Sequence, residues 1–262
     1  MSLTGKSPSE TYKDIAYVDN SNNGVTTSLK EVKTGSGSST ALQVSDRSLL
    51  VKSATDNTTA LDVQNASGSS KLLVDTTNNY VKANGVHVNA QYKEFGLYDF
   101  SPTAGYHYGM ISSNVMESSG GADFASTTAW GNGADPATSL EIHSAHVSVA
   151  LDGFPSYWYL MDSISIDEIR VLARCDSSEN LNFHVYSYDL DTSTNHGNLS
   201  GGTLIAHINS VMAATGLAIK TDTLVIDSDT VAANKILVAF VENEDGTGDI
   251  SCQLNIKYHI TG

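Results

Sequence analysis

Seven runs in the second part of the chain alternate apolar and polar residues with a period of two, the pattern of β-strands with one buried face. They are rich in β-branched and aromatic residues, and no helical periodicity separates them. The runs span residues 140–151, 163–175, 181–190, 203–210, 222–229, 235–243 and 250–260. Their number and short connections predict an all-β fold, an antiparallel β-sandwich of jelly-roll type.

Two connections in this part carry local signals. The segment EDGTGD, between Val241 and Ile250, predicts a hairpin because Asp-Gly tolerates positive φ. The segment NSVMAATGLA, residues 209–218, predicts one short helix that Gly216 would cap.

The first part of the chain has shorter alternations, separated by clusters of Gly, Asn, Asp and Ser that indicate turns. It also has an internal echo: TALQV at 40–44 returns as TALDV at 59–63, and SLLV at 48–51 returns as KLLV at 71–74. The echo predicts a repeated strand-turn-strand unit. Such small units cannot bury an apolar face alone and need stacked neighbours.

Composition divides the chain near residue 96. Residues 1–96 hold nine basic, nine acidic and five aromatic side chains, whereas residues 97–262 hold five, twenty and fifteen. Aromatic side chains bring the largest buried area per residue, so the first part lacks material for a core of its own. We therefore predict an oligomerising β-repeat region at 1–96 and a sandwich domain at 97–262, with other copies of the chain as the neighbours. The alternative is a flexible polar linker with chance echoes.

The net charge of the chain argues against some classes of function. The formal net charge is -15, which disfavours binding to nucleic acid or to a membrane surface. The 77 Ser, Thr and Asn residues keep the chain soluble through hydroxyls and amides. No apolar run is long enough to span a membrane and no secretion signal is visible, so folding in the cytosol and no membrane insertion are expected.

Candidate metal ligands are few. Asp189, Asp191, Ser193 and Asn195 supply oxygens at alternate positions, as a calcium loop does, but the glycine and distal glutamate of that loop are absent. A plain polar loop is the favoured interpretation. The acidic segment with Glu242, Glu244, Asp245 and Asp249 could take a cation or form a solvated turn. His143 and His146 would point to opposite faces of a strand, so no zinc site is expected.

No catalytic apparatus is visible, and neither an enzyme nor a cofactor is expected. The motifs HExxH and GxSxG are absent, and the adjacent carboxylates Asp167 and Glu168 would point to opposite faces of a strand. Cys175 and Cys252 fall in predicted strands, and a bridge between them would need those strands to be adjacent.

One aromatic group suggests recognition. Tyr157, Trp158 and Tyr159 are consecutive, and Trp130 lies upstream. Exposed aromatic faces stack on sugar rings, so these four residues are candidate glycan ligands. The alternative is that they belong to the core or to a subunit interface.

The opening TGKSPSETYKDIAYVDNSNNGV, followed by TSLKEVKTGSGSSTALQVSDRSLLV, resembles the N-terminal stretch of tail-fibre, spike and other virion-surface proteins of tailed bacteriophages, especially marine ones. The resemblance covers about the first 85 residues. It implies a homotrimeric appendage or a capsid decoration protein. The N-terminal part would dock on capsid or tail proteins or form a stalk, and the second domain would form an outward head.

The expected function is therefore that of a structural protein of a bacteriophage virion, assembled in the host cytoplasm, with host-surface glycan binding by the head as an added expectation. A carbohydrate-binding module without a virion role and a polysaccharide-cleaving spike are the alternatives. The second alternative needs a carboxylate pair or a triad in a groove.

Overall fold

The computed structural model describes residues 16–21, 23–102, 104–105, 107–112, 157–175, 179–191, 198–213, 219–244 and 248–261. These residues form strands β1 to β20, every pairing is antiparallel, and none of them lies in a helix. The all-β class predicted from the sequence is confirmed. The chain has two compact units: a front unit up to Val88 and a sandwich unit from Asn89.

No helix in the described part of the chain is long and apolar enough to cross a membrane.

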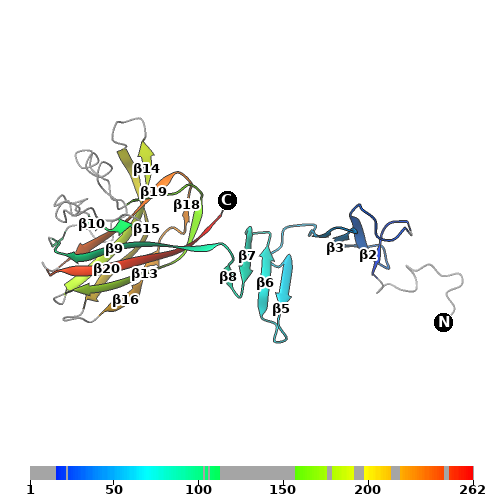
Figure 1. Ribbon diagram of the computed structural model, residues 1–262, viewed down its shortest axis with the longest axis horizontal. Coiled ribbons are helices and arrows are strands. Elements are labelled where there is room, and N and C mark those ends of the chain that lie inside the picture. Colours follow the sequence, from blue (N-terminus) through cyan, green and yellow to red (C-terminus); the bar gives the residue numbers. More distant parts are fainter. Residues whose placement is uncertain are drawn as a thin grey trace. The chain divides into compact units, whose positions relative to one another are not determined.

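The front unit contains two four-stranded meanders (Figure 1). In each, the strands pair in chain order, because every connection is short enough to return the chain to the neighbouring position. The first sheet holds β1 (Ala16–Val18), β2 (Lys30–Thr34), β3 (Ser39–Val44) and β4 (Leu49–Val51). The second holds β5 (Leu61–Gln64), β6 (Ser70–Asp75), β7 (Tyr80–Ala83) and β8 (Val86–His87).

The sequence echo corresponds to two equivalent hairpins. In β3–β4, Leu42 lies opposite Val51 and Val44 opposite Leu49. In β5–β6, Leu61 lies opposite Val74 and Val63 opposite Leu72. Each TALxV segment thus pairs with its LLV segment in the same Leu-Val register, and the predicted strand-turn-strand repeat is present.

The sandwich unit consists of two antiparallel sheets (Figure 1), as predicted. The first, called the β14 sheet, has the order β10-β19-β14-β15-β17, with β12 also paired to β19. Its strands are β10 (His107–Gly109), β12 (Tyr157–Tyr159), β14 (Glu179–Asp191), β15 (Asn198–Ala213), β17 (Val225–Ile226) and β19 (Lys235–Asn243).

The second, called the β13 sheet, has the order β11-β9-β20-β13-β16, with β18 also paired to β13. Its strands are β9 (Ala90–Phe100), β11 (Ile111–Ser112), β13 (Ile164–Cys175), β16 (Lys220–Thr223), β18 (Thr230–Val231) and β20 (Ile250–Ile260).

Short strands join the two sheets along both edges. β10 pairs in the β14 sheet and β11 in the β13 sheet, with only the buried Met110 between them. At the other edge, β16 and β18 pair with β13, while β17 pairs with β15. The chain therefore crosses between the sheets at each edge and limits access to the core.

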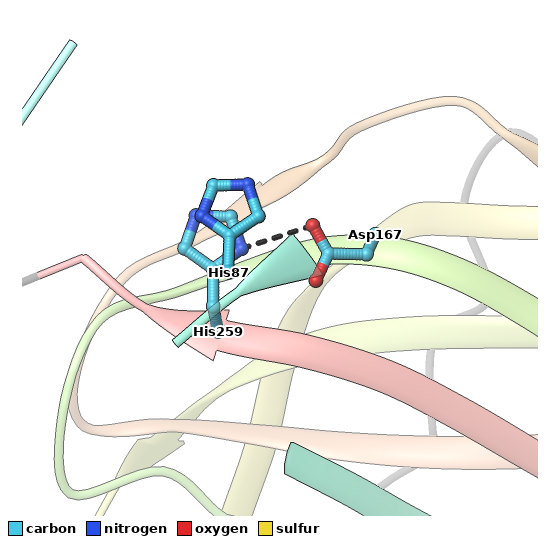
Figure 2. Close-up of side chains that lie close together, drawn as sticks. All are labelled: His87, Asp167 and His259. Carbon is cyan, nitrogen blue, oxygen red and sulfur yellow. Dashed lines mark hydrogen bonds and ion pairs between the residues drawn. The ribbon is translucent and has the colours of Figure 1, made fainter. Parts of the chain in front are cut away.

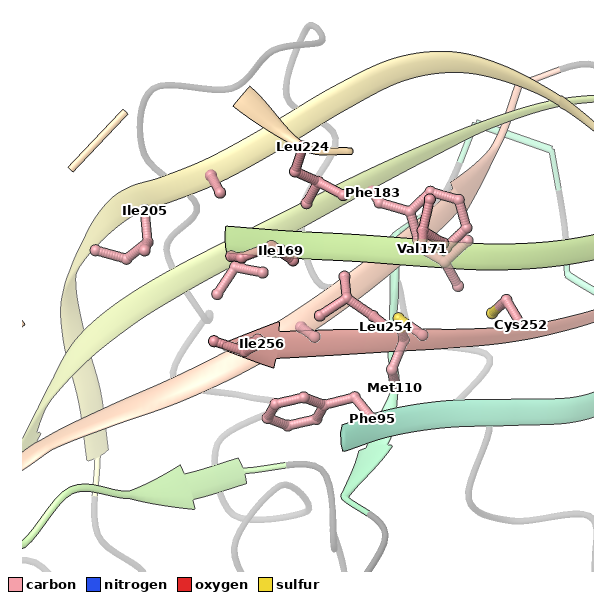
Figure 3. Packing of buried hydrophobic residues seen from close by; sticks show 14 of the residues in the cluster. Phe95, Met110, Ile169, Val171, Phe183, Ile205, Leu224, Cys252, Leu254 and Ile256 are labelled. Atoms are coloured by element: carbon pink, nitrogen blue, oxygen red, sulfur yellow. The ribbon is translucent and has the colours of Figure 1, made fainter. Parts of the chain in front are cut away.

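The main core fills the space between the sheets (Figure 3). Ile169 and Val171 of β13 and Leu254 and Ile256 of β20 face Phe183 and its neighbours on the β14 sheet, as the period of two requires. A second cluster covers the opposite face of the β14 sheet; it contains Tyr186, Tyr188, Leu199, Ile236, Val238 and Phe240. β19 is therefore buried on both faces.

Two local predictions about connections are wrong. The segment after Val241 does not close a hairpin, because β19 and β20 belong to different sheets. On either side of the undescribed residues 245–247, the buried Glu179 carboxylate accepts hydrogen bonds from Asn243 Nδ2 and from the Gly248 amide. The predicted helix at 209–218 is also wrong for residues 209–213, which continue β15; residues 214–218 lie outside the described residues.

The next two predictions concern a strand before Tyr157 and the boundary between the units. The predicted strand at 140–151 lies outside the described residues. The predicted boundary after residue 96 falls inside β9, whose residues 90 to 100 pair with β20. The two units divide instead between Val88 and Asn89, since all of β9 belongs to the sandwich.

Candidate functional site

Among the predicted aromatic glycan ligands, Trp158 points away from the face that Tyr157 and Tyr159 share. Tyr157, Trp158 and Tyr159 form β12, in which successive side chains point to opposite sides. The Trp158 ring packs against the main core, 4.8 Å from the ring of Tyr258. Tyr157 and Tyr159 are exposed, and the Tyr159 hydroxyl donates to Asn234 Oδ1 at 2.6 Å. Tyr157 and Tyr159 therefore share one face of β12 and Trp158 points to the other, while Trp130 lies outside the described residues.

The predicted calcium ligands lie at a strand end. Asp189 belongs to β14, and its Oδ1 atom is 2.5 Å from Lys235 Nζ on the neighbouring β19. Asp191 is the last residue of β14, and Asn195 lies outside the described residues. The lysine ammonium already supplies Asp189 with a positive charge, which favours a structural ion pair over a cation site.

The predicted acidic turn is partly buried. Glu242 lies on β19, and its Oε2 atom accepts from Asn182 Nδ2 at 3.1 Å. Asn182 Nδ2 also donates to Glu244 Oε1 at 2.8 Å, while the His107 Nε2 atom lies 3.6 Å from Glu242 Oε2. The interpretation of Glu242 as part of a solvated turn is therefore wrong: one amide holds both carboxylates in place. Asp245 lies outside the described residues.

The carboxylates of Asp167 and Glu168 have separate partners, as expected from their adjacent positions. Figure 2 shows Asp167 joined to His259, with Oδ1 3.0 Å from Nδ1. Glu168 Oε1 accepts from Arg170 Nε at 2.6 Å. The register of β13 shifts between Ile166 and Glu168, so Asp167 occupies a β-bulge and its contact with His259 ties that bulge to β20.

The two cysteines lie on adjacent strands and are not joined by a disulfide. Ala173, not Cys175, lies opposite Cys252, and Cys175 lies opposite Ile250. The condition set by the sequence, adjacent strands, is met, but the register separates the two sulfur atoms by two positions. Burial raises the pKa of the Cys252 thiol to about 12.

The front unit has no buried apolar side chain among its described residues, whereas the sandwich unit holds a full core. The β5–β8 sheet of the front unit instead has apolar side chains together on one face. In the pairing register one face carries only apolar residues, here called the apolar face: Leu61, Val63, Leu72, Val74, Val81, Ala83 and Val86. Val63 is 48% exposed. The equivalent hairpin of the first sheet exposes 66% of Leu49.

The sandwich unit has a groove of about 260 Å³ on the β13 sheet. It crosses strands β9, β20 and β13 and is lined by Leu97, Tyr98, Leu172, Ala173, Arg174, Ile219, Ser251, Cys252 and Gln253. None of these described lining residues is a carboxylate, so the acid pair needed to cleave a polysaccharide is not found in the lining. Sequence patterns did not indicate this groove, because its residues come from four separate segments.

No known protein family matches the chain, and no curated protein matches it. Among solved structures, the chain is similar to the Clostridium thermocellum endo-1,4-beta-D-xylanase 10B, in a structure of its CBM22-1 and GH10 modules with xylohexaose. The two chains are 13% identical, and the match covers 40% of this chain and 18% of that chain, with a TM-score of 0.23. A likeness this slight carries no argument about function.

Proposed function

We propose that the chain is a structural subunit of a bacteriophage virion, a homotrimeric surface appendage or capsid decoration protein. The front unit binds sister copies and other virion proteins, and the sandwich unit forms an exposed head. The observation that supports this proposal is the apolar face of the front unit, which no described residue of that unit buries.

Energetics favour burial of this face by a partner. Full burial of a Val or Leu side chain stabilises by about 1.5–3 kcal/mol, and the exposed fractions of Leu61, Val63 and Leu72, 37%, 48% and 37%, leave part of that gain to be made when a partner covers them. A single-layer sheet without a hydrophobic layer against it is marginal in water. Copies of the same chain are the natural partner because each carries the same complementary face.

Charge supports the same arrangement. Residues 1–88 carry eight basic and eight acidic side chains, whereas residues 89–262 carry six and twenty-one. Front units without net charge associate without strong mutual repulsion. Acidic heads repel one another and stay soluble where many copies are crowded on a particle. The resemblance of the first 85 residues or so to phage virion-surface proteins supports the biological setting.

Light scattering coupled to gel filtration tests the assembly. The full chain is expected to elute at three times its 27.8 kDa mass. Changing Val63 and Leu72 to Ser removes an opposed pair from the apolar face and is expected to shift the chain toward 27.8 kDa. The matched control changes Gln64 and Lys71, the sequence neighbours of this pair, to Ser and is expected to leave the trimer intact.

A full chain that stays at 27.8 kDa at micromolar concentration would contradict the assembly. Equal loss of mass in both double variants would show that the apolar face is not the contact. The virion setting has its own test: antibody labelling and peptide mass spectrometry of purified phage particles should place the chain on their surface. Finding it only in the particle-free fraction would overturn that part of the proposal.

A further inference from the structure

We infer that the groove on the β13 sheet binds a neutral sugar ring of a polysaccharide, with Tyr98 as the stacking platform. Tyr98 is 84% exposed, although it lies in β9, a strand whose other face packs against the core. An aromatic ring so exposed beside a hollow offers a flat apolar surface to the C–H face of a sugar. This inference does not depend on virion assembly.

The backbone around Tyr98 contains a β-bulge and a residue with positive φ. Leu97 lies opposite Cys252 and Phe100 opposite Ile250, so Tyr98 and Asp99 together face the single residue Ser251. Asp99 adopts φ of 51°, a conformation that non-glycine residues seldom take. Such bulges redirect a side chain and concentrate at binding sites. Here the bulge coincides with the most exposed large apolar side chain of the described residues.

Hydrogen-bonding groups stand beside the platform. Ser251 lies opposite Arg174, and Gln253 lies opposite Leu172 in the next row of the sheet. Ser251, Gln253 and Arg174, which carry a hydroxyl, an amide and a guanidinium group, are therefore among the residues that line an otherwise apolar hollow. The Ser251 hydroxyl oxygen accepts from the Asp99 amide at 3.1 Å, which leaves its O–H to donate. Sugar hydroxyls both donate and accept, so they suit this set of groups.

The volume of the groove and the net charge of the sandwich unit limit the class of ligand that can bind. A volume of about 260 Å³ is below the roughly 300–1,000 Å³ typical of sites for drug-sized ligands, which suits one ring of a longer chain. Residues 89–262 carry fifteen more acidic than basic side chains, since twenty-one acidic minus six basic is fifteen. The resulting field repels polyanions. Neutral glycans are therefore the expected class, with acidic glycans as the contrasting probe.

Saturation-transfer NMR and calorimetry on the full chain test this inference. The probes are soluble neutral hexaoses of glucose, mannose and galactose, with oligogalacturonate as the anionic probe. We expect at least one neutral hexaose to bind with millimolar or tighter affinity, and oligogalacturonate to bind at least tenfold more weakly. No binding by any neutral probe, or tighter binding of oligogalacturonate, would overturn the inference.

Matched variants locate the site. Tyr98→Ala is expected to weaken binding at least tenfold, and Gln253→Ala by several-fold, with melting temperatures close to that of the unchanged chain. Tyr92→Ala is the control, because Tyr92 is 69% exposed on the same strand but does not line the groove. Equal losses in the Tyr92 and Tyr98 variants would overturn the assignment. So would a change in oligomeric state in Tyr98→Ala, which would indicate a second copy in the groove.

Discussion

Tyr188 places a phenol group within the second buried cluster of the β14 sheet. Its side chain is fully buried, and its hydroxyl has no hydrogen-bond partner among the described residues. Burial, followed by the nearby Tyr186, raises the Tyr188 pKa well above its ordinary value, so the group stays protonated in the fold. A buried hydroxyl without a partner destabilises a fold, since its hydrogen bonds to water are lost.

We therefore expect Tyr188→Phe to leave the free energy of unfolding unchanged or to raise it by up to about 1 kcal/mol. Tyr258→Phe is the matched comparison, because the Tyr258 hydroxyl donates to Gln91 Oε1 at 2.9 Å. Losing that bond is expected to destabilise by about 1 kcal/mol. Urea unfolding of both variants measures the difference; a larger loss in Tyr188→Phe would contradict the prediction.

Burial of Cys252 lowers the stability of the fold at alkaline pH. Burial raises its folded pKa to about 12, against an ordinary value of 9.0. Between these values the unfolded chain loses the thiol proton while the folded chain keeps it, so stability falls as pH rises. The slope from this group is at most about 1.4 kcal/mol per pH unit.

In Cys252→Ala this contribution is absent, so stability should fall less steeply above pH 9 than in the unchanged chain. Chemical unfolding at several pH values from 7 to 11 measures both slopes. The variant is less stable at pH 7 because the packed thiol is lost, and the comparison therefore concerns slopes only. Parallel curves would contradict the prediction.

At the scale of a strand, β9 shows how one irregularity shapes a surface. Phe95 and Leu97 face the core in regular alternation, and the next core residue, Phe100, follows after three positions. The extra residue creates the bulge and returns Phe100 to the core, directly after the exposed Tyr98. This break in the period of two is visible in the sequence and is the signal that could have indicated the groove.

Substitutions at Asp99 test the strain in this bulge. Asp99 has φ of 51°, which glycine adopts freely and β-branched residues adopt with difficulty. Asp99→Gly is expected to match or exceed the unchanged chain by up to about 1 kcal/mol, whereas Asp99→Val should lose about 1–2 kcal/mol. Thermal unfolding measures both. Equal stability of the two variants would show that the bulge conformation is not strained.

At the scale of the whole molecule, the two units differ in how they become stable. Every buried apolar side chain among the described residues lies in the sandwich unit. A chain of residues 89–262 is therefore expected to fold alone, with a melting temperature independent of concentration. The full chain should add a transition that rises with concentration, because association stabilises the front unit by mass action. A single concentration-independent transition in the full chain would contradict this.

The unit boundary is tested in the same experiment. A chain that starts at residue 97 lacks residues 90–96, including the fully buried Phe95, and exposes the edge of β20. It should be less stable than residues 89–262 by several kcal/mol, since removal of a buried Phe alone costs about 3–5 kcal/mol. Comparable stability of the two chains would favour the boundary at residue 96.

The sequence by itself determined several long strands, the faces of those strands and the contrast between the units, but not β9, and its run at 222–229 divides between β16 and β17 of different sheets. A period of two specifies which side chains share a face, so the runs at 163–175, 181–190, 235–243 and 250–260 reappear as β13, β14, β19 and β20. The repeated TALxV and LLV segments likewise predicted equivalent hairpins, because neighbouring segments joined by a short turn pair locally.

Only the tertiary structure decided which strands pair at long range and where the chain changes sheets. The Asp-Gly segment after Val241 favours a turn, but β19 is already paired to β14 on one edge and to β10 and β12 on the other, so β20 pairs in the other sheet. The groove likewise needs Tyr98, Leu172 and Gln253 side by side, from strands far apart in the chain. Local preferences amount to about a kcal/mol per residue, whereas packing of whole faces involves many times that, so packing decides the topology.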